Sequence, residues 1–193
     1  MAAPPVPGLR FQPSDEEIVR VYLIPKILGR LNTYDVVTTE DVYSTSPEQL
    51  PLGNDAGHFI DNEWYFYTTR PISSHYRTRN GFYFATSMNE PILHNNNVVG
   101  FRRFLRFYLG SRPETGIETE WTVYEFRANP AVFPAANLLG SVVQEKLSSM
   151  VMCKIVRIQE LSDNSSEEGV KDESGSSRIN LLQNTRLNLQ SSL

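Results

Sequence analysis

The stretch that decides the fold reads Glu-Trp-Tyr-Phe-Tyr at residues 63–67 and continues to Gly-Phe-Tyr-Phe-Ala-Thr at residues 81–86. Short aromatic runs broken by turn residues favour antiparallel strands over helices. The pattern extends towards the C-terminus and predicts five strands, Glu63–Thr68, Gly81–Thr86, Val98–Leu109, Glu120–Phe126 and Met150–Ile158. Residues 110–116 hold two glycines and a proline, which predicts a hairpin loop between the third and fourth strands. We expect most of the aromatic side chains to form the sheet core, among them Trp64, Phe66 and Trp121.

The N-terminal part of the chain carries two helix start signals. Ser14 precedes three acids, so its side chain can accept from the backbone N–H of Glu17 while the Glu17 carboxylate reaches back to Ser14. An apolar face follows, and Pro25 is expected to limit or kink this helix within about three turns. Ser46 followed by Pro47 repeats the signal and predicts a single helical turn.

Length and composition indicate one globular domain with a tail. The chain has 193 residues, of which 40% are hydrophobic and 21% are charged, so it can bury a sizeable core. From residue 161 onward serine, asparagine and acids dominate, and such a segment cannot offset its ordering entropy by packing. We therefore expect a domain over residues 1–160 and a disordered C-terminal tail over residues 161–193.

Several classes of protein are excluded by what the sequence lacks. The single cysteine, Cys153, lies in an apolar run typical of a buried strand, and the three histidines are far apart, so neither a disulfide framework nor a zinc site is expected. No signal peptide or apolar run of membrane-spanning length is present, which predicts a soluble intracellular protein. Phosphate loops, nucleophile elbows and dinucleotide fingerprints are also missing, so we expect neither an enzyme nor a cofactor.

Charge is sorted along the chain. Residues 64–112 contain seven arginines and one acid, Glu90, whereas the chain as a whole has a net charge of −4. A basic segment in an acidic protein indicates a surface that meets a polyanion. Within residues 100–108, alternation puts Arg102 and Arg106 on one face of the strand and Arg103 on the other.

Two interpretations of these arginines stay open on the residues alone. On a solvent-facing sheet surface they can contact phosphate oxygens. Alternatively, they pair with the glutamates of the neighbouring hairpin strand, Glu118, Glu120 and Glu125.

Blocks of the sequence, in order, resemble the NAC domain of plant transcription factors. Residues 7–18 are similar to the family opening P-G-F-R-F-x-P-T-D-E-E-L, and residues 81–86 are similar to the strand G-Y-W-K-A-T-G. The further similar blocks are residues 37–51, 63–67, 99–108, 119–127 and 152–155. The resemblance covers about residues 7–158.

This resemblance implies a mainly β, α+β fold, in which a twisted antiparallel sheet is flanked by short helices. It also implies a nuclear protein that inserts its W-K-A-T-G strand into the major groove of double-stranded DNA. Dimerisation would take place through the N-terminal segment, as a homodimer or as a heterodimer with related NAC-type proteins. The residues that match the family's dimer contact are Pro7, Gly8, Leu9, Arg10 and Glu17, with Arg10 and Glu17 forming reciprocal salt bridges.

The chain departs from the family in the strand that reads DNA. The family's groove-reading lysine falls on Phe84 and a later lysine falls on Glu90, so two cations become one apolar group and one anion. Since a base-edge contact is typically worth about 1–3 kcal/mol of discrimination, the loss should weaken sequence reading. The remaining candidates for DNA contact are Arg77, Arg79, Arg102, Arg103 and Arg106, with Tyr83 and Phe84 as possible contacts to thymine methyl groups.

Two functions are therefore compatible with the sequence. The first is a NAC-type, DNA-binding transcription regulator that contacts DNA through an arginine-rich sheet edge. The alternative is a NAC-like interaction protein that forms heterodimers with related factors without strong DNA binding, and Phe84 and Glu90 favour it.

Overall fold

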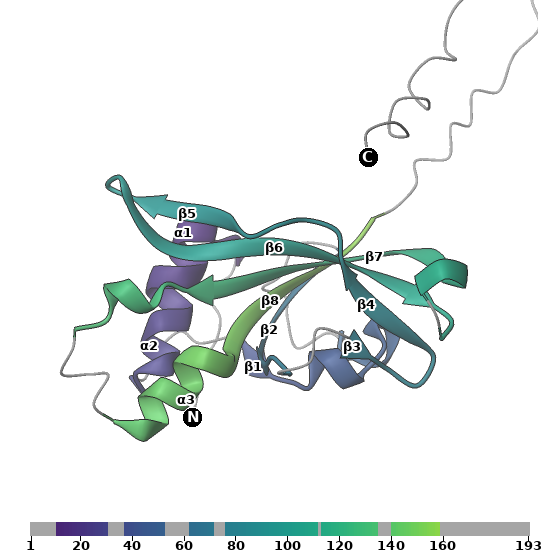
Figure 1. The fold of residues 1–193 in the computed structure, drawn as a ribbon, viewed down its shortest axis with the longest axis horizontal. Helices are drawn as coiled ribbons and strands as arrows, with labels where there is room; N and C mark the ends of the chain where they lie inside the picture. The colour runs from purple at the N-terminus through teal and green to yellow at the C-terminus, as the bar shows by residue number, and fades with distance from the viewer. Residues whose placement is uncertain are drawn as a thin grey trace, which may run out of the picture. The chain divides into compact units, whose positions relative to one another are not determined.

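A single curled sheet organises the protein (Figure 1). The computed structural model describes residues 11–30, 37–52, 62–71, 76–111, 113–134 and 140–158. The strands are β1 (Thr38–Thr39), β2 (Glu63–Thr69), β3 (Tyr76–Arg77), β4 (Gly81–Ala85), β5 (Glu90–His94), β6 (Asn97–Leu109), β7 (Ile117–Ala128) and β8 (Met150–Arg157). Their order is β1-β2-β8-β7-β6-β4-β3, and β5 also pairs with β6. Every pairing is antiparallel except that between β1 and β2, which is parallel.

The predicted mainly β, α+β fold is confirmed, and so are the five predicted strands, to within three residues at each end. The hairpin between β6 and β7 is also present, with the short turn η4 (Pro113–Thr115) in its loop. The sequence interpretation missed β1, β3, β5 and the helix α3 (Ser141–Ser149). Trp64 is only partly buried, whereas Phe66 and Trp121 lie in the core as expected. Residues 161–193 lie outside the described residues, so the domain boundary and the tail stay predictions.

The N-terminal helical segment begins with the predicted capping box. The Glu17 N–H donates to the Ser14 hydroxyl at 3.3 Å, and the Ser14 N–H donates to the Glu17 carboxylate at 2.8 Å. The segment runs through α1 (Asp15–Glu17), the π-helical η1 (Ile18–Leu23) and α2 (Ile24–Ile27). It passes Pro25 and ends two residues later, ahead of Gly29, whose positive φ of 68° suits the end of a helix.

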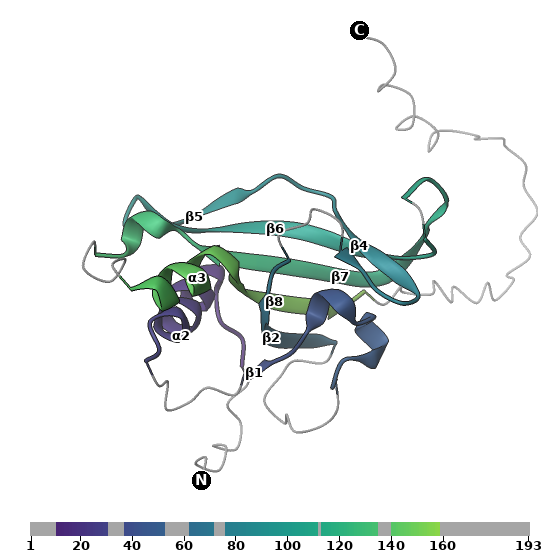
Figure 2. The same cartoon turned by 60° about the horizontal axis from the view of Figure 1, so that its bottom comes forward.

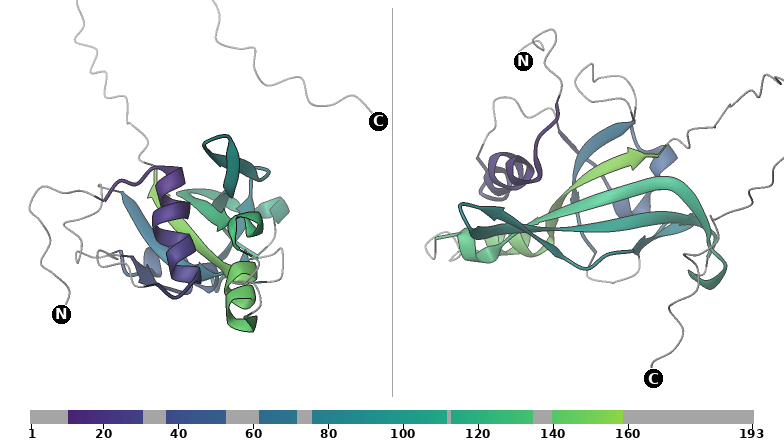
Figure 3. Two further views of the ribbon diagram at one scale, coloured as in Figure 1. Left: turned by 90° about the vertical axis from the view of Figure 1, so that its left-hand side faces the viewer. Right: turned by 90° about the horizontal axis from the view of Figure 1, so that it is seen from above.

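Two hydrophobic clusters use opposite faces of the sheet. Along β8, Met152 belongs to one cluster and its neighbours Val151 and Cys153 belong to the other, as alternation along a strand requires. The helix-side cluster packs Ile18, Val19, Leu23 and Ile27 against the sheet. Figure 3 shows the N-terminal helical segment lying across the strands on that face.

The second cluster, here called the inner cluster, fills the curl of the sheet. It contains Tyr43, Leu50, Tyr83, Phe107 and other buried residues of β2, β6, β7 and β8. The short helices η2 (Val42–Ser44) and η3 (Pro47–Gln49) cover it (Figure 2). The turn predicted at Ser46 and Pro47 is η3. The inner cluster therefore fixes β3 and β4, which carry Arg77, Tyr83 and Phe84 and flank Arg79, four of the residues proposed to contact DNA.

Candidate nucleic-acid interface

Strand β4 corresponds to the strand that the resemblance places in the DNA groove. Gly81 opens it, and a Cβ there would overlap the backbone carbonyl of Tyr108, so only glycine allows this close pairing with β6. Tyr83 points into the inner cluster, is 2% exposed, and donates from its hydroxyl to the carbonyl of Thr45 at 2.7 Å. The proposed contact between Tyr83 and DNA is therefore wrong, because its ring is not at the surface.

Phe84 lies on the opposite face of β4 from Tyr83. Its side chain is 50% exposed, it faces Arg106 across the strand pair, and its ring meets the edge of Tyr108 at 6.4 Å between centroids. Met88, four residues on, is 88% exposed. The segment from Phe84 to Met88 thus presents apolar side chains to solvent, and Phe84 does so at a position where the resemblance places a lysine.

Arg77 and Arg79 stand at the edge of the sheet next to Phe84. Arg77 ends β3 and pairs with Phe82 of β4, which puts it on the same face as Phe84. Both arginines are exposed and line a cleft of about 330 Å³ together with Thr78, Asn80, Gly81, Gly110 and Ser111. Within the part of the chain that the structure describes, no carboxylate lines this cleft or pairs with either arginine. Two uncompensated cations beside hydroxyl and amide groups can bind phosphate oxygens.

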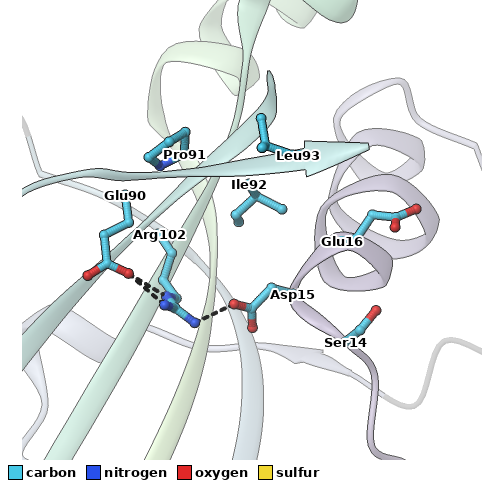
Figure 4. A pocket seen from close by; sticks show the side chains of 8 residues that line it. All are labelled: Ser14, Asp15, Glu16, Glu90, Pro91, Ile92, Leu93 and Arg102. Atoms are coloured by element: carbon cyan, nitrogen blue, oxygen red, sulfur yellow. Dashed lines mark hydrogen bonds and ion pairs between the residues drawn. The ribbon is translucent and has the colours of Figure 1, made fainter. Parts of the chain in front are cut away.

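Arg102 is held between two carboxylates (Figure 4). Its guanidinium lies 2.6 Å from Glu90 on β5 and 2.5 Å from Asp15 on α1. Burial acts to lower the pKa of Arg102, but the hydrogen bonds that Arg102 donates to Glu90 and the charge of Asp15 outweigh it and raise the pKa above its usual value. These three residues line a surface pocket of about 400 Å³ that is acidic in character.

Arg106 and Arg103 are also paired. Arg106 lies 2.5 Å from Glu118 across the β6–β7 hairpin, on the same side of β6 as Arg102. Arg103 lies on the other side, where its Nε is 2.8 Å from Oε1 of Glu125, its direct cross-strand neighbour. The predicted alternation of the three arginines is confirmed. Of the two interpretations left open, the structure agrees with pairing, because each guanidinium is already paired with a neighbouring carboxylate and none is freely presented to a phosphate.

The Arg103–Glu125 pair is the centre of a buried polar network. Glu125 is fully buried, and its Oε2 accepts from the hydroxyl of Tyr43 and, at 3.0 Å, from Nη2 of Arg103. Arg103 also donates to the hydroxyl of Tyr76 at 2.5 Å, and the rings of Tyr43 and Tyr76 stack at 4.4 Å. Burial raises the pKa of Tyr43, so its hydroxyl stays protonated and serves as the donor to Glu125.

Cys153 borders this network. Its Sγ is 3.4 Å from the Tyr43 hydroxyl, and burial, followed by the charge of Glu125, raises the pKa of the thiol. The prediction of a buried, apolar setting for Cys153 is confirmed, and a protonated thiol is a poor nucleophile.

The proposed dimer contact falls mostly outside the described residues. Pro7, Gly8, Leu9 and Arg10 are not among them. Glu17 is exposed and uses Oε2 to close the capping box with Ser14. The capping role of Glu17 is confirmed, and its salt bridge with Arg10 stays a prediction.

The described residues show neither a metal-binding cluster nor a membrane-spanning helix. No group of three or more histidine, cysteine, aspartate or glutamate side chains in that part of the chain is arranged to hold a metal ion. Nor does that part contain a helix long and apolar enough to cross a membrane.

Pairing of the arginines with Glu118 and Glu125 was one of the two open interpretations and is confirmed for Arg106 and Arg103. Glu120, named with them, pairs with Arg157 instead, and sequence reasoning missed both partners of Arg102. Asp15 is 87 residues from Arg102 in the sequence, and no local pattern links them. The full burial of Glu125 was likewise not expected, because glutamate is almost never fully buried unless it is paired. A signal did exist for the hairpin pairs, because the acids of β7 face the arginines of β6 in an antiparallel register.

These features define a mainly β domain whose curled sheet exposes, at one edge, two arginines that pair with no carboxylate among the described residues. The No apical meristem (NAM) protein family matches residues 5–128 of the chain. NAC domain-containing protein 67 of Oryza sativa subsp. japonica is 34% identical over 77% of this chain and 54% of its own length. NAC domain-containing protein 1 of Solanum lycopersicum is 31% identical over 80% of this chain and 55% of its own length.

NAC transcription factor 29 of Arabidopsis thaliana is 30% identical over 86% of this chain and 62% of its own length. The chain belongs to the NAC-domain family. It spans little more than half the length of the first curated relatives it matches.

The buried network gives a prediction about stability. Glu125→Gln removes the one carboxylate among the described residues that compensates the partly buried Arg103, so we expect the free energy of unfolding to fall by about 3 kcal/mol. Glu120→Gln is the matched control, because Glu120 pairs with Arg157 at the surface and an exposed pair contributes about 0–1 kcal/mol. Urea denaturation of both variants measures the difference, and equal losses would contradict the central place of Glu125.

Proposed function

We propose that this chain is a nuclear NAC-type transcription regulator that pairs with a second NAC domain and binds double-stranded DNA with weak sequence preference. Membership of the NAC-domain family and relatives named as transcription factors support the regulatory role. The observation that carries the DNA contact is the cleft of Arg77 and Arg79, which are exposed and unpaired within the described chain.

The contact surface follows from where these side chains lie. Arg77 shares a face with Phe84, so an approaching duplex would meet cations and an apolar ring together. The arginines contact phosphate oxygens, which positions a duplex but carries no sequence information. Phe84 offers apolar contact to a thymine methyl group, in place of a hydrogen bond to a base edge. Affinity should therefore depend strongly on salt and only weakly on sequence.

A second function is favoured by the paired arginines. Arg102, Arg103 and Arg106 are neutralised by Glu90, Glu125 and Glu118, which leaves the edge with few free cations. A NAC domain of this kind would pair with related factors and withdraw them from DNA. The two functions differ in whether this chain binds DNA by itself.

Binding to random duplex DNA over a series of salt concentrations separates these functions. The DNA-binding proposal predicts that affinity falls steeply with salt, with a logarithmic slope near −0.9 for each neutralised phosphate. Arg77→Ala combined with Arg79→Ala should weaken binding to every sequence and reduce the slope by about two, because two phosphate contacts are lost. Fluorescence anisotropy measures both quantities.

The matched control is Arg20→Ala combined with Arg157→Ala, which removes two exposed arginines that are paired with Glu16 and Glu120. This control should leave DNA binding nearly unchanged. An absence of binding by the wild-type chain at low salt would eliminate the first function and favour the second. Equal effects of the two double variants would show that the contact surface lies elsewhere.

Glu90 gives a second prediction for the same assay. Glu90→Gln removes a negative charge from the edge of the sheet that is proposed to contact DNA. It also releases Arg102 from one of its two partners, while Asp15 keeps Arg102 near the sheet. We expect stronger DNA binding and a steeper salt dependence. Glu120→Gln again serves as the control, and unchanged binding by Glu90→Gln would show that Glu90 does not oppose DNA.

Dimerisation is tested by charge reversal at Arg10, alone and in combination with Glu17→Arg, which gives up the Glu17 side-chain half of the capping box. Arg10→Glu should give monomers in analytical ultracentrifugation, because it places two acids in apposition. Glu17→Gln should weaken the dimer too, although glutamine still accepts from the Ser14 N–H and preserves the capping box. The combination of Arg10→Glu with Glu17→Arg should restore association. A dimer that persists in all three variants would remove the proposed bridge.

A further inference from the structure

A second cluster of arginines lies on the opposite face of the sheet from Phe84. Arg103 and Arg127 alternate with the helix-side residues of β6 and β7, so they point to the same side as Glu125. Arg70, directly after β2, joins them. The three guanidinium groups lie 2.8, 4.0 and 3.9 Å from the carboxylate of Glu125, in the order Arg103, Arg127 and Arg70.

One carboxylate cannot satisfy three guanidinium groups. Oε2 of Glu125 accepts from Arg103 and Tyr43, while Oε1 makes no hydrogen bond although it lies 2.8 Å from Nε of Arg103. Arg70 and Arg127 therefore sit at ion-pair distance without a hydrogen bond to it, and no other carboxylate among the described residues lies within 4.0 Å of either. The cluster holds three positive charges against one negative charge.

The excess positive charge of Arg70 and Arg127 is partly buried. The side chains of Arg70 and Arg127 are 26% and 27% exposed, which leaves each guanidinium partly open to solvent. Arg127 is held over the ring of Phe101 at 5.8 Å, so its position is fixed by packing. Burial lowers the pKa of Arg127, and the neighbouring Arg70 lowers it further. Like charges gathered in such a place are destabilising until an anion joins them.

We propose that Arg70 and Arg127, organised by the Arg103–Glu125 pair, form an anion site that takes a phosphate-type oxyanion. Guanidinium groups match phosphate oxygens through paired, charge-assisted hydrogen bonds, and two partly exposed forks provide more donors than a single oxyanion needs. The site is distinct from the cleft of Arg77 and Arg79, because Arg103 and Arg77 occupy opposite faces of the sheet. It does not depend on DNA binding by that cleft.

The test is a titration of the whole chain with inorganic phosphate, followed by NMR of the arginine Nε–Hε groups. Ionic strength is held constant with chloride. We expect saturable shifts of Arg70 and Arg127, and a higher melting temperature in phosphate than in chloride, because a ligand that binds only the folded state stabilises it. Shifts that do not saturate, or that chloride reproduces, overturn the proposal.

Single variants locate the site. Arg70→Gln and Arg127→Gln should each weaken phosphate binding by about tenfold or more, the loss expected for a charge-assisted hydrogen bond. Arg70 makes no hydrogen bond to Glu125, so Arg70→Gln leaves the Arg103–Glu125 pair in place and the variant should remain folded by circular dichroism. Arg157→Gln is the control with an exposed arginine, and phosphate binding by Arg70→Gln equal to that of Arg157→Gln contradicts the assignment.

Duplex DNA in the same titration identifies the source of the phosphate group. If DNA displaces inorganic phosphate from Arg70 and Arg127, the site belongs to the nucleic-acid surface. If DNA shifts Arg77 and Arg79 while phosphate stays bound, the site serves a separate phosphate-bearing ligand. Both outcomes support the anion site, whereas a failure of DNA to bind at all affects only the function proposed for the Arg77 and Arg79 cleft.

Discussion

The interaction on which the rest of the structure depends is the buried ion pair between Arg103 of β6 and Glu125 of β7. A charge buried in a protein is tolerated only when it is paired and when its remaining hydrogen-bonding groups find partners. Tyr43 and Tyr76 partner Oε2 of Glu125 and Nη2 of Arg103, and both come from short elements with little structure of their own. Nε of Arg103 and Oε1 of Glu125 make no hydrogen bond and lie 2.8 Å apart. The pair thus ties η2 and the two-residue strand β3 to the sheet. The position of Arg77, which follows Tyr76 directly, depends on the same pair.

The clustering of arginines in the middle of the sequence did not predict a single positive surface on the folded protein. The middle of the chain is strongly basic, and its arginines could have formed one positive surface. Instead, acids from the flanking segments fold back onto it: Asp15 meets Arg102, Glu118 meets Arg106, and Glu125 meets Arg103. What remains uncompensated is a smaller set on two faces of the sheet. The net charge of a segment therefore limits how much charge a surface can carry, but it does not show where on the fold that charge lies.

The sequence predicted the parts of the fold that have a local physical cause. The capping box at Ser14 and Glu17 needs only neighbouring residues, and strands such as Glu63–Thr69 carry their own aromatic and β-branched side chains. Strands β1 and β3 have two residues each and exist only because β2 and β4 pair with them, so no local pattern could reveal them. The hairpin before β6 did have a signal: Asn95 and Asn96 both adopt positive φ, which asparagine tolerates better than most residues.

The candidate site could be predicted from the sequence only as far as the alternation of side chains between the two faces of a strand allowed. Period two correctly separated Arg103 from Arg102 and Arg106, and it also separates buried Tyr83 from exposed Phe84. Which side faces solvent depends on the curl of the sheet and on the helices that cover it, and these are tertiary properties. For this reason Tyr83 was misplaced, whereas the exposed pair Arg77 and Arg79 kept its place among the proposed contacts.

The side chains at the edge of the sheet that is proposed to contact DNA are compatible with both proposed functions. In the proposed function, Arg77 and Arg79 would supply attraction to any duplex, while the side chains of Phe84 and Met88 are apolar and carry no hydrogen-bond donor that could distinguish one base pair from another. Such an edge adds affinity without adding specificity. In a heterodimer, a related domain that retains base-reading lysines would choose the site, and this chain would strengthen or weaken the hold according to the balance between Arg77, Arg79 and Glu90. Phe84 and Glu90, which weaken the sequence-specific DNA binding of this chain alone, would then let it modulate the DNA binding of its partner.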